Sequence, residues 1–118
     1  MKWIIENTHW IIGFAGVWIL GNGILHDVFI LLQKRPFERE LIRLLIDGHI
    51  LIFSGIFFLI CFKPLQEGSG LALLLCMVNA LFMLGYCALI FKMLPAVGII
   101  AISLVVLVVS VAAKFYPR

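Results

Sequence analysis

Charged side chains are scarce in this chain: only 13% of its 118 residues are Asp, Glu, Lys or Arg, about half the share of a soluble domain. The hydrophobic share is 64%, whereas a soluble domain is about half apolar. This composition excludes a soluble enzyme domain and a disordered chain. Each bilayer-spanning helix uses about 20 apolar residues, so four spans would occupy nearly the whole chain and leave no room for a sizeable domain outside a membrane.

Cysteine is also rare, and the basic residues form no stripe. Cys61, Cys76 and Cys87 all lie inside apolar runs, without a C-x-x-C pair. This odd number argues against a disulfide framework and favours three small buried hydrophobic residues. The net charge is +3, but the basic residues lie at the ends of apolar runs, as expected for membrane interfaces. We therefore expect no nucleic-acid partner.

Polar turns divide the chain into four apolar runs, at about residues 8–32, 41–62, 71–93 and 96–113. The connections between them are too short for anything but antiparallel neighbours. The sequence therefore predicts an all-α, four-transmembrane-helix antiparallel bundle, with residues 1–118 forming a single membrane domain.

The expected location is the cell (inner) membrane, with multiple spans. The dense group of cations at the first turn favours termini on the outer side. Glu6 and His9 interrupt what would be the apolar core of a signal peptide, so we expect the first helix to remain in the mature protein.

The first run contains LGNGILHD at residues 20–27, and the second contains LLIDGHI at residues 44–50. The size of the chain, its four spans, its glycine-rich first helix and its short loops resemble the small bacterial DoxX-like membrane proteins. This likeness covers the whole chain in architecture but includes no diagnostic motif. It implies a four-helix membrane fold and carries over no activity and no site residue.

Small residues line one face of the first predicted helix. On a helical wheel His9, Gly13, Gly16, Gly23 and Asp27 fall within roughly 80° of one another. Such a stripe lets a second helix approach closely. We therefore predict that the three glycines are helix-packing residues and that Asp27 faces a helix rather than lipid.

Polar residues from all four runs are expected at a common depth. Asp27 precedes the first turn by about six residues, and Asp47 follows that turn by a similar number; Tyr86 and Ser103 lie about as far from the third turn. At 1.5 Å per residue, each side chain would lie about 10 Å beneath the same membrane face. This predicts a polar intramembrane cluster of His26, Asp27, Arg43, Asp47, His49, Tyr86 and Ser103.

The spacing within this cluster suggests a counter-ion. Arg43 and Asp47 are four residues apart, which allows side chains on one helix to meet. A lone charge at this depth costs a few kcal/mol even on lenient scales. Our hypothesis is that Arg43 bridges Asp27 and Asp47, with Tyr86 donating a hydrogen bond. This network could be structural, or it could bind a proton, a cation or an amphipathic ligand.

Metal chemistry is disfavoured by helical geometry. Imidazoles and carboxylates suit zinc or iron, but the adjacent residues His26 and Asp27 are about 100° apart on their helix. His49 is about 200° from Asp47. The four side chains therefore cannot reach one ion together without distorting the helices. We therefore expect no metal, no cofactor and no catalytic residue.

The sequence favours a non-catalytic binding, accessory or scaffold role. The expected partners are the lipid bilayer, a lipid or amphipathic small molecule, and a second copy or another membrane protein. The alternative is a proton-coupled small-solute transporter or channel, because two acids facing one guanidinium could leave one acid protonated. The chain lacks the mid-helix Glu of small multidrug-resistance transporters and the Asn-x-x-Gly stretch and Phe/Thr-rich third helix of fluoride channels.

Overall fold

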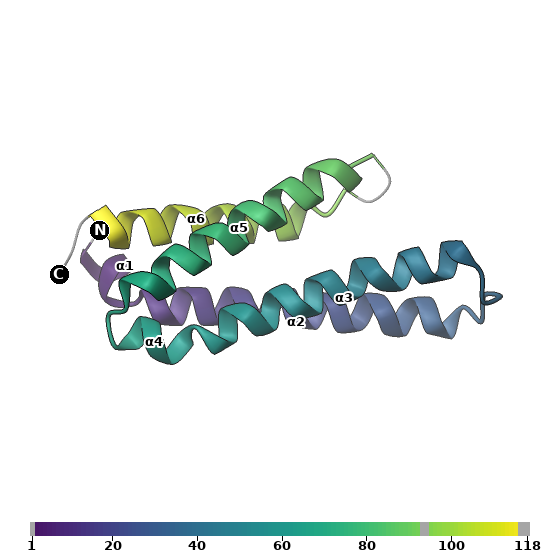
Figure 1. Cartoon of the computed structure of the whole chain (residues 1–118), viewed down its shortest axis with the longest axis horizontal. Helices are drawn as coiled ribbons and strands as arrows, with labels where there is room; N and C mark the ends of the chain where they lie inside the picture. The colour runs from purple at the N-terminus through teal and green to yellow at the C-terminus, as the bar shows by residue number, and fades with distance from the viewer. Residues whose placement is uncertain (1, 93–94, 116–118) are drawn as a thin grey trace.

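A computed structural model describes residues 2–92 and 95–115, and helices form all the regular secondary structure within these two ranges. The helices are α1 Lys2–Glu6, α2 Thr8–Leu32, α3 Arg39–Ile60, α4 Phe62–Gln66, α5 Gly70–Ile90 and α6 Val97–Phe115 (Figure 1). Four stretches of the described chain are long and apolar enough to cross a membrane: α2, α3 together with α4, α5 and α6. The prediction of an all-α chain with four such helices is confirmed.

The helix ends depart from the predicted spans mainly after the second span. The helix is interrupted at Cys61 and then continues as α4 to Gln66, past Pro64. Pro64 lies in the first turn of α4, where a missing backbone N–H costs little because such groups lack intrahelical partners. The third span was predicted to end at residue 93, which lies outside the described residues.

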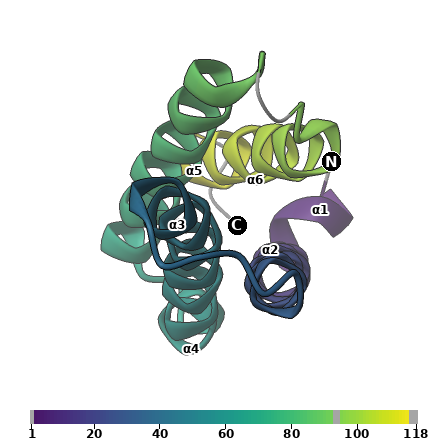
Figure 2. The ribbon, with the colours of Figure 1, turned by 90° about the vertical axis from the view of Figure 1, so that its right-hand side faces the viewer.

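The helices form two antiparallel hairpins, α2–α3 and α5–α6, in a molecule measuring 53 × 25 × 20 Å. Figure 1 shows α1, the start of α2 and the end of α6 at one end of the molecule. From there the hairpins diverge, and α5 ends and α6 begins well short of the level of the α2–α3 turn (Figure 1). Figure 2 shows the pair α5 and α6 beside the pair α2 and α3. Contacts within each hairpin are more extensive than contacts between the hairpins.

Glycine pairs bring the backbones of α2 and α3 together. A Cβ atom added to Gly16 would lie 2.9 Å from the carbonyl oxygen of Gly55, and one added to Gly23 would lie 2.8 Å from that of Gly48. The two pairs are seven residues apart on each helix, so they belong to one antiparallel register. Close backbone approach through small residues is a usual way for apolar helices to associate.

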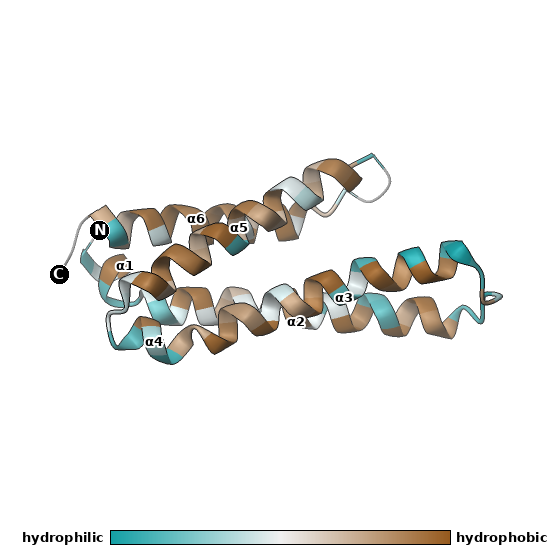
Figure 3. Ribbon diagram, viewed as in Figure 1, coloured by the Kyte–Doolittle hydropathy of each residue, from teal (hydrophilic) through white to brown (hydrophobic). Residues whose placement is uncertain are grey.

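The α5–α6 hairpin packs through ordinary side chains. Its buried stripe on α5 contains Cys76, Ala80 and Met83, and its stripe on α6 contains Ile99 and Val106. The outward faces of all four long helices are predominantly hydrophobic (Figure 3). Contiguous apolar surface of this extent indicates a membrane or a protein partner rather than water.

Candidate functional site

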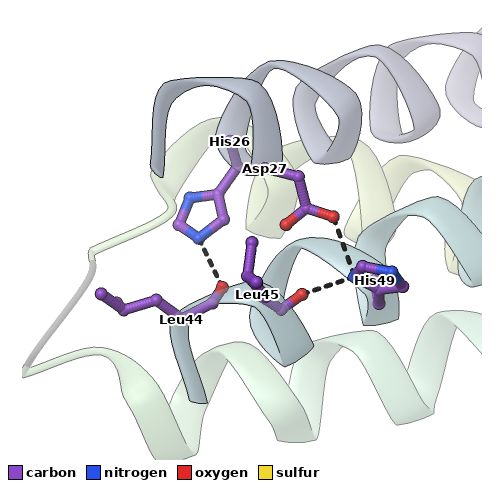
Figure 4. A network of polar contacts seen from close by, with 5 residues as sticks. All are labelled: His26, Asp27, Leu44, Leu45 and His49. Carbon is purple, nitrogen blue, oxygen red and sulfur yellow. Dashed lines mark hydrogen bonds and ion pairs between the residues drawn. The ribbon is translucent and has the colours of Figure 1, made fainter. Parts of the chain in front are cut away.

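A buried carboxylate and an exposed imidazole meet across the α2–α3 interface. Asp27 lies on α2 with its side chain 11% exposed, and its Oδ2 atom is 2.8 Å from Nδ1 of His49 on α3. The side chain of His49 is 71% exposed. Figure 4 shows the carboxylate pointing from α2 toward the ring on α3. The pair therefore connects an acid enclosed between two helices to the outer surface of α3.

The surroundings of Nδ1 in His49 determine where its hydrogen lies. This nitrogen is also 2.7 Å from the carbonyl oxygen of Leu45 (Figure 4). A carbonyl oxygen can only accept, so Nδ1 carries a hydrogen, shared between Leu45 and the carboxylate of Asp27. The other ring nitrogen, Nε2, is on the edge turned away from Asp27. Within residues 2–92 and 95–115, no group forms a hydrogen bond with it.

The space for the carboxylate is provided by Gly48. A Cβ atom at this position would collide with Oδ1 of Asp27, which is buried and has no hydrogen-bond partner in the described part of the chain. His26, the neighbour of Asp27 on α2, donates from Nε2 to the carbonyl oxygen of Leu44 at 3.0 Å. Both α2 side chains are thus held against one short segment of α3.

A second set of polar contacts joins α3 to α5. The hydroxyl group of Tyr86 donates to Oδ1 of Asp47. Farther along the same two helices, Ser54 and Asn79 form two hydrogen bonds. Oγ of Ser54 donates to Oδ1 of Asn79, and Nδ2 of Asn79 donates to the carbonyl oxygen of Ser54, each at 3.2 Å. The two contacts are seven residues apart on both helices. α3 therefore presents one polar face to α2 and another to α5.

Arg43 is not the counter-ion of Asp27 and Asp47, so the bridging hypothesis is wrong. The residue is exposed, and the ion pairs found among the described residues do not include it. The two acids contact different helices, because Asp27 is enclosed between α2 and α3 whereas Asp47 reaches Tyr86 on α5. One guanidinium cannot serve both, and His49 supplies the partner of Asp27.

Ser103 does not join the cluster either. Gly98, near the start of α6, lies beside the indole of Trp18, which precedes Asp27 by nine residues. α6 then runs antiparallel to α2, so Ser103 is more than about 13 Å along the axis from the level of Asp27. The two turns do not lie at one depth, as the prediction required, because α6 begins well short of the α2–α3 turn (Figure 1).

The glycine stripe of α2 packs against other helices of the same chain. Gly13, Gly16 and Gly23 all face α3 and α4. Sequence reasoning missed their partners on α3, Gly48 and Gly55. A usable signal was present, because these two glycines repeat the seven-residue spacing of Gly16 and Gly23.

A groove of about 450 Å³ opens between α3 and α5, beside the contact between Ser54 and Asn79. Its polar lining residues are His49, Ser54 and Asn79, and the rest of the lining is made of phenylalanine and isoleucine side chains, including Phe53, Phe57 and Phe82. A mainly apolar wall with a few placed polar groups is typical of sites for small molecules, whose volumes run from about 300 to 1,000 Å³. We name this feature the α3–α5 groove.

Residues 2–92 and 95–115 contain no group of three or more His, Cys, Asp or Glu side chains that could hold a metal ion. No protein-family model, curated protein or solved structure matches this chain. The described residues form two apolar helical hairpins, in which an exposed imidazole, His49, pairs with a buried acid, Asp27, and also lines a groove.

Proposed function

We propose that this protein is a multi-pass integral membrane protein that binds an amphipathic small molecule in the α3–α5 groove, without catalysing a reaction. The observation that carries the proposal is the groove itself, with its phenylalanine-rich wall and its three polar lining residues. An amphipathic molecule has the apolar body and the isolated polar group that such a wall complements.

Membrane insertion is supported by the distribution of apolar residues. The long helices expose large hydrophobic side chains over most of their outward surface (Figure 3), among them Phe29, Phe53, Leu89 and Val108. In water these faces would cost about 25 cal/mol per Å² of exposed apolar area. Lipid removes that cost, so the bilayer is the solvent that the surface fits.

The test of this proposal is photolabelling in lipid nanodiscs. The probe is a long-chain alcohol that carries a diazirine group, and mass spectrometry maps its adducts on the chain. We expect adducts concentrated on the walls of the groove, at residues 46–57 of α3 and 79–82 of α5. Uniform labelling of every lipid-facing helix would contradict the proposal.

Two matched variants control this experiment. Ile50→Trp places a large ring in the groove, whereas Val108→Trp places the same ring on the exposed face of α6. Labelling of the groove should fall several-fold in Ile50→Trp and be unchanged in Val108→Trp. Equal labelling in both variants would show that the adducts form outside the groove.

A second candidate function is proton-coupled transport, favoured by one feature of the site. Asp27 has a buried carboxylate oxygen without a hydrogen-bond partner among the described residues, next to an imidazole that reaches the surface. Such a pair could exchange a proton with a passing solute. Substrate-dependent proton flux in liposomes under a pH gradient, lost in Asp27→Asn, would establish this role and overturn the non-catalytic binding role.

A further inference from the structure

We infer that two copies of this chain associate through α2, with the amide group of Asn22 in one copy bonded to the amide group of Asn22 in the other. We name the contact surface the α2 face, and its residues are Trp18, Asn22, Leu25 and Phe29. The inference goes beyond the proposed function. The two share only the insertion of the chain in a membrane, because none of these residues lines the α3–α5 groove.

The α2 face is left uncovered where α2 extends past α6. Trp18 lies beside Gly98, in the first turn of α6, and the part of α2 that follows Trp18 continues toward the α2–α3 turn (Figure 1). Leu25 and Phe29 are 69% and 63% exposed, and Asn22 is exposed as well. The four residues of the face fall within about 60° of one another on a helical wheel. The side of α2 that meets α6 at Trp18 therefore continues as an exposed surface.

The hydrogen bonds of Asn22 leave its amide group self-complementary. Nδ2 donates one of its two hydrogens to the carbonyl oxygen of Trp18 at 2.8 Å. One N–H donor and the acceptor Oδ1 remain, and within residues 2–92 and 95–115 neither forms another hydrogen bond. Two such amide groups related by a twofold axis can satisfy each other, because each donates to the oxygen of the other. A symmetric contact of this kind is usual in dimers of identical chains.

The depth of Asn22 makes a protein partner necessary. Gly23 faces Gly48 in the antiparallel α2–α3 register, so the exposed Arg43 lies at the level of Val28. Even with Arg43 at the headgroup layer, Asn22 is six residues deeper, about 9 Å beneath it. In the other direction α2 continues for about 21 Å. Acyl chains carry no hydrogen-bonding group, so the amide has to be satisfied by another protein group.

The spacing of the α2 face is that of a parallel helix pair. Starting at Trp18, its residues follow at intervals of four, three and four, which are the a and d positions of a heptad. In a parallel pair each of these positions lies opposite the same position of the other helix. A single Asn at such a contact fixes the register and the number of helices. The glycine stripe on the opposite side of α2 already packs on α3 and α4, so the α2 face is the side of this helix that is open to a second copy.

The first experiment measures association of the full chain by sedimentation equilibrium in a density-matched neutral detergent. We expect a monomer–dimer equilibrium whose dissociation constant rises at least about tenfold in Asn22→Leu, as for the loss of hydrogen bonds between helices. Asn22→Gln keeps the amide group and should retain the dimer. Asn79→Leu is the matched control, because Asn79 bonds to Ser54 within the chain, and it should leave the dissociation constant unchanged. A monomeric parent, or an Asn22→Leu dimer as tight as the parent, would overturn the inference.

Disulfide cross-linking in liposomes tests the same face and carries the test if Asn22→Leu does not fold. Leu25→Cys places a thiol on the α2 face, whereas Leu89→Cys places one on α5, where Leu89 is 87% exposed. The native cysteines are buried, and the parent chain measures their background. With copper phenanthroline as the oxidant, we expect linked dimers of Leu25→Cys at a yield several-fold above that of Leu89→Cys. Equal yields at the two positions would overturn the parallel contact through α2.

The outcomes also separate this inference from the proposed function. Ile50→Trp fills the α3–α5 groove and should leave the dissociation constant of the dimer unchanged. Asn22→Leu should in turn leave photolabelling of the groove unchanged. A labelled groove in a chain that stays monomeric would overturn the α2 contact alone, and a dimer without groove labelling would overturn the proposed function alone.

Discussion

The two hairpins of this protein use the same kind of apolar helix in different ways. α2 and α3 approach each other backbone to backbone through Gly16, Gly23, Gly48 and Gly55. α5 and α6 contact through side chains of ordinary size, and a Cβ atom added to any of their glycines, Gly70, Gly85 or Gly98, would have no backbone atom among its neighbours within 4 Å. The α2–α3 hairpin also holds the buried acid of the chain, whereas the α5–α6 hairpin contains no ionisable pair among its described residues.

The difference shows why close packing and polar chemistry occur together. The carboxylate of Asp27 fits between the helices only because Gly48 opposite it has no side chain. The same close approach brings the carboxylate within reach of His49, which lies next to Gly48 on α3. In the α5–α6 hairpin, by contrast, the buried polar atoms are hydroxyl groups such as Oγ of Ser103, which the described part of the chain leaves without a partner.

The largest effect is expected from a substitution that breaks the backbone contact in the α2–α3 hairpin. In Gly55→Ala the new Cβ atom would lie 2.6 Å from the backbone nitrogen of Leu20 and 2.7 Å from the carbonyl oxygen of Gly16. The helices must separate, because no flexible side chain can move away. We expect a loss of about 3 kcal/mol in the free energy of unfolding, as in severe overpacking, measured by thermal or denaturant unfolding in detergent.

The matched control for this change is Gly21→Ala. Gly21 is on α2 as well, but an added Cβ atom meets nothing within 4 Å. This variant should be as stable as the parent, or more stable by up to about 1 kcal/mol because alanine favours the helix. Equal losses at positions 21 and 55 would show that the close contact does not hold the hairpin together.

The next largest effect is expected from removal of the imidazole that pairs with Asp27. His49→Ala leaves the buried carboxylate of Asp27 without its hydrogen-bond donor. We expect a loss of about 2 kcal/mol, the range of hydrogen bonds to charged groups. His26→Ala should cost less than about 1 kcal/mol, because the carbonyl oxygen of Leu44 keeps its helical bond. The double variant His49→Ala with Asp27→Leu should be more stable than His49→Ala alone, since it removes the unpaired charge. A less stable double variant would refute the pairing.

A smaller effect should come from the contact between the hairpins. Tyr86→Phe removes the hydroxyl group that donates to Asp47, and we expect a loss of about 1 kcal/mol. In an Asp47→Leu background the same change should have almost no effect. A double-mutant cycle measures this coupling directly. Additive losses would mean that the two side chains do not interact in the folded protein.

The smallest effect is expected at Arg43. Its side chain is exposed and makes no ion pair with the described residues. Arg43→Leu should therefore change the free energy of unfolding by less than about 0.5 kcal/mol. A loss of several kcal/mol on unfolding in detergent would restore Arg43 as a counter-ion and contradict the arrangement described above.

The all-α class and the number of long apolar helices could be predicted from the sequence, because four apolar runs with short turns allow few other folds. The burial of Asp27 against a helix could also be predicted, because small residues share its face of α2. Both predictions depend only on the pattern along one helix, which the sequence contains in full.

The partners of each polar residue could not be derived in this way. A helical wheel places Asp47 and His49 on opposite faces of α3 without saying which face meets α2. Depth counted from the turns failed for Ser103, because the hairpins differ in length and diverge. The matching seven-residue glycine spacings of α2 and α3 contained the missing register. They identify Gly48 as the residue opposite Gly23, and with it the position of His49.

The most direct test of the central claim is the ¹⁵N NMR spectrum of histidine-labelled protein in nanodiscs, without added ligand. The account predicts that Nδ1 of His49 carries a hydrogen and that its resonance shifts in Asp27→Asn, while the resonances of His26 keep their positions. Assignment follows from His49→Phe and His26→Phe. A hydrogen-free Nδ1 in His49, or a His49 spectrum indifferent to Asp27→Asn, would contradict the acid–imidazole pair and the site built on it.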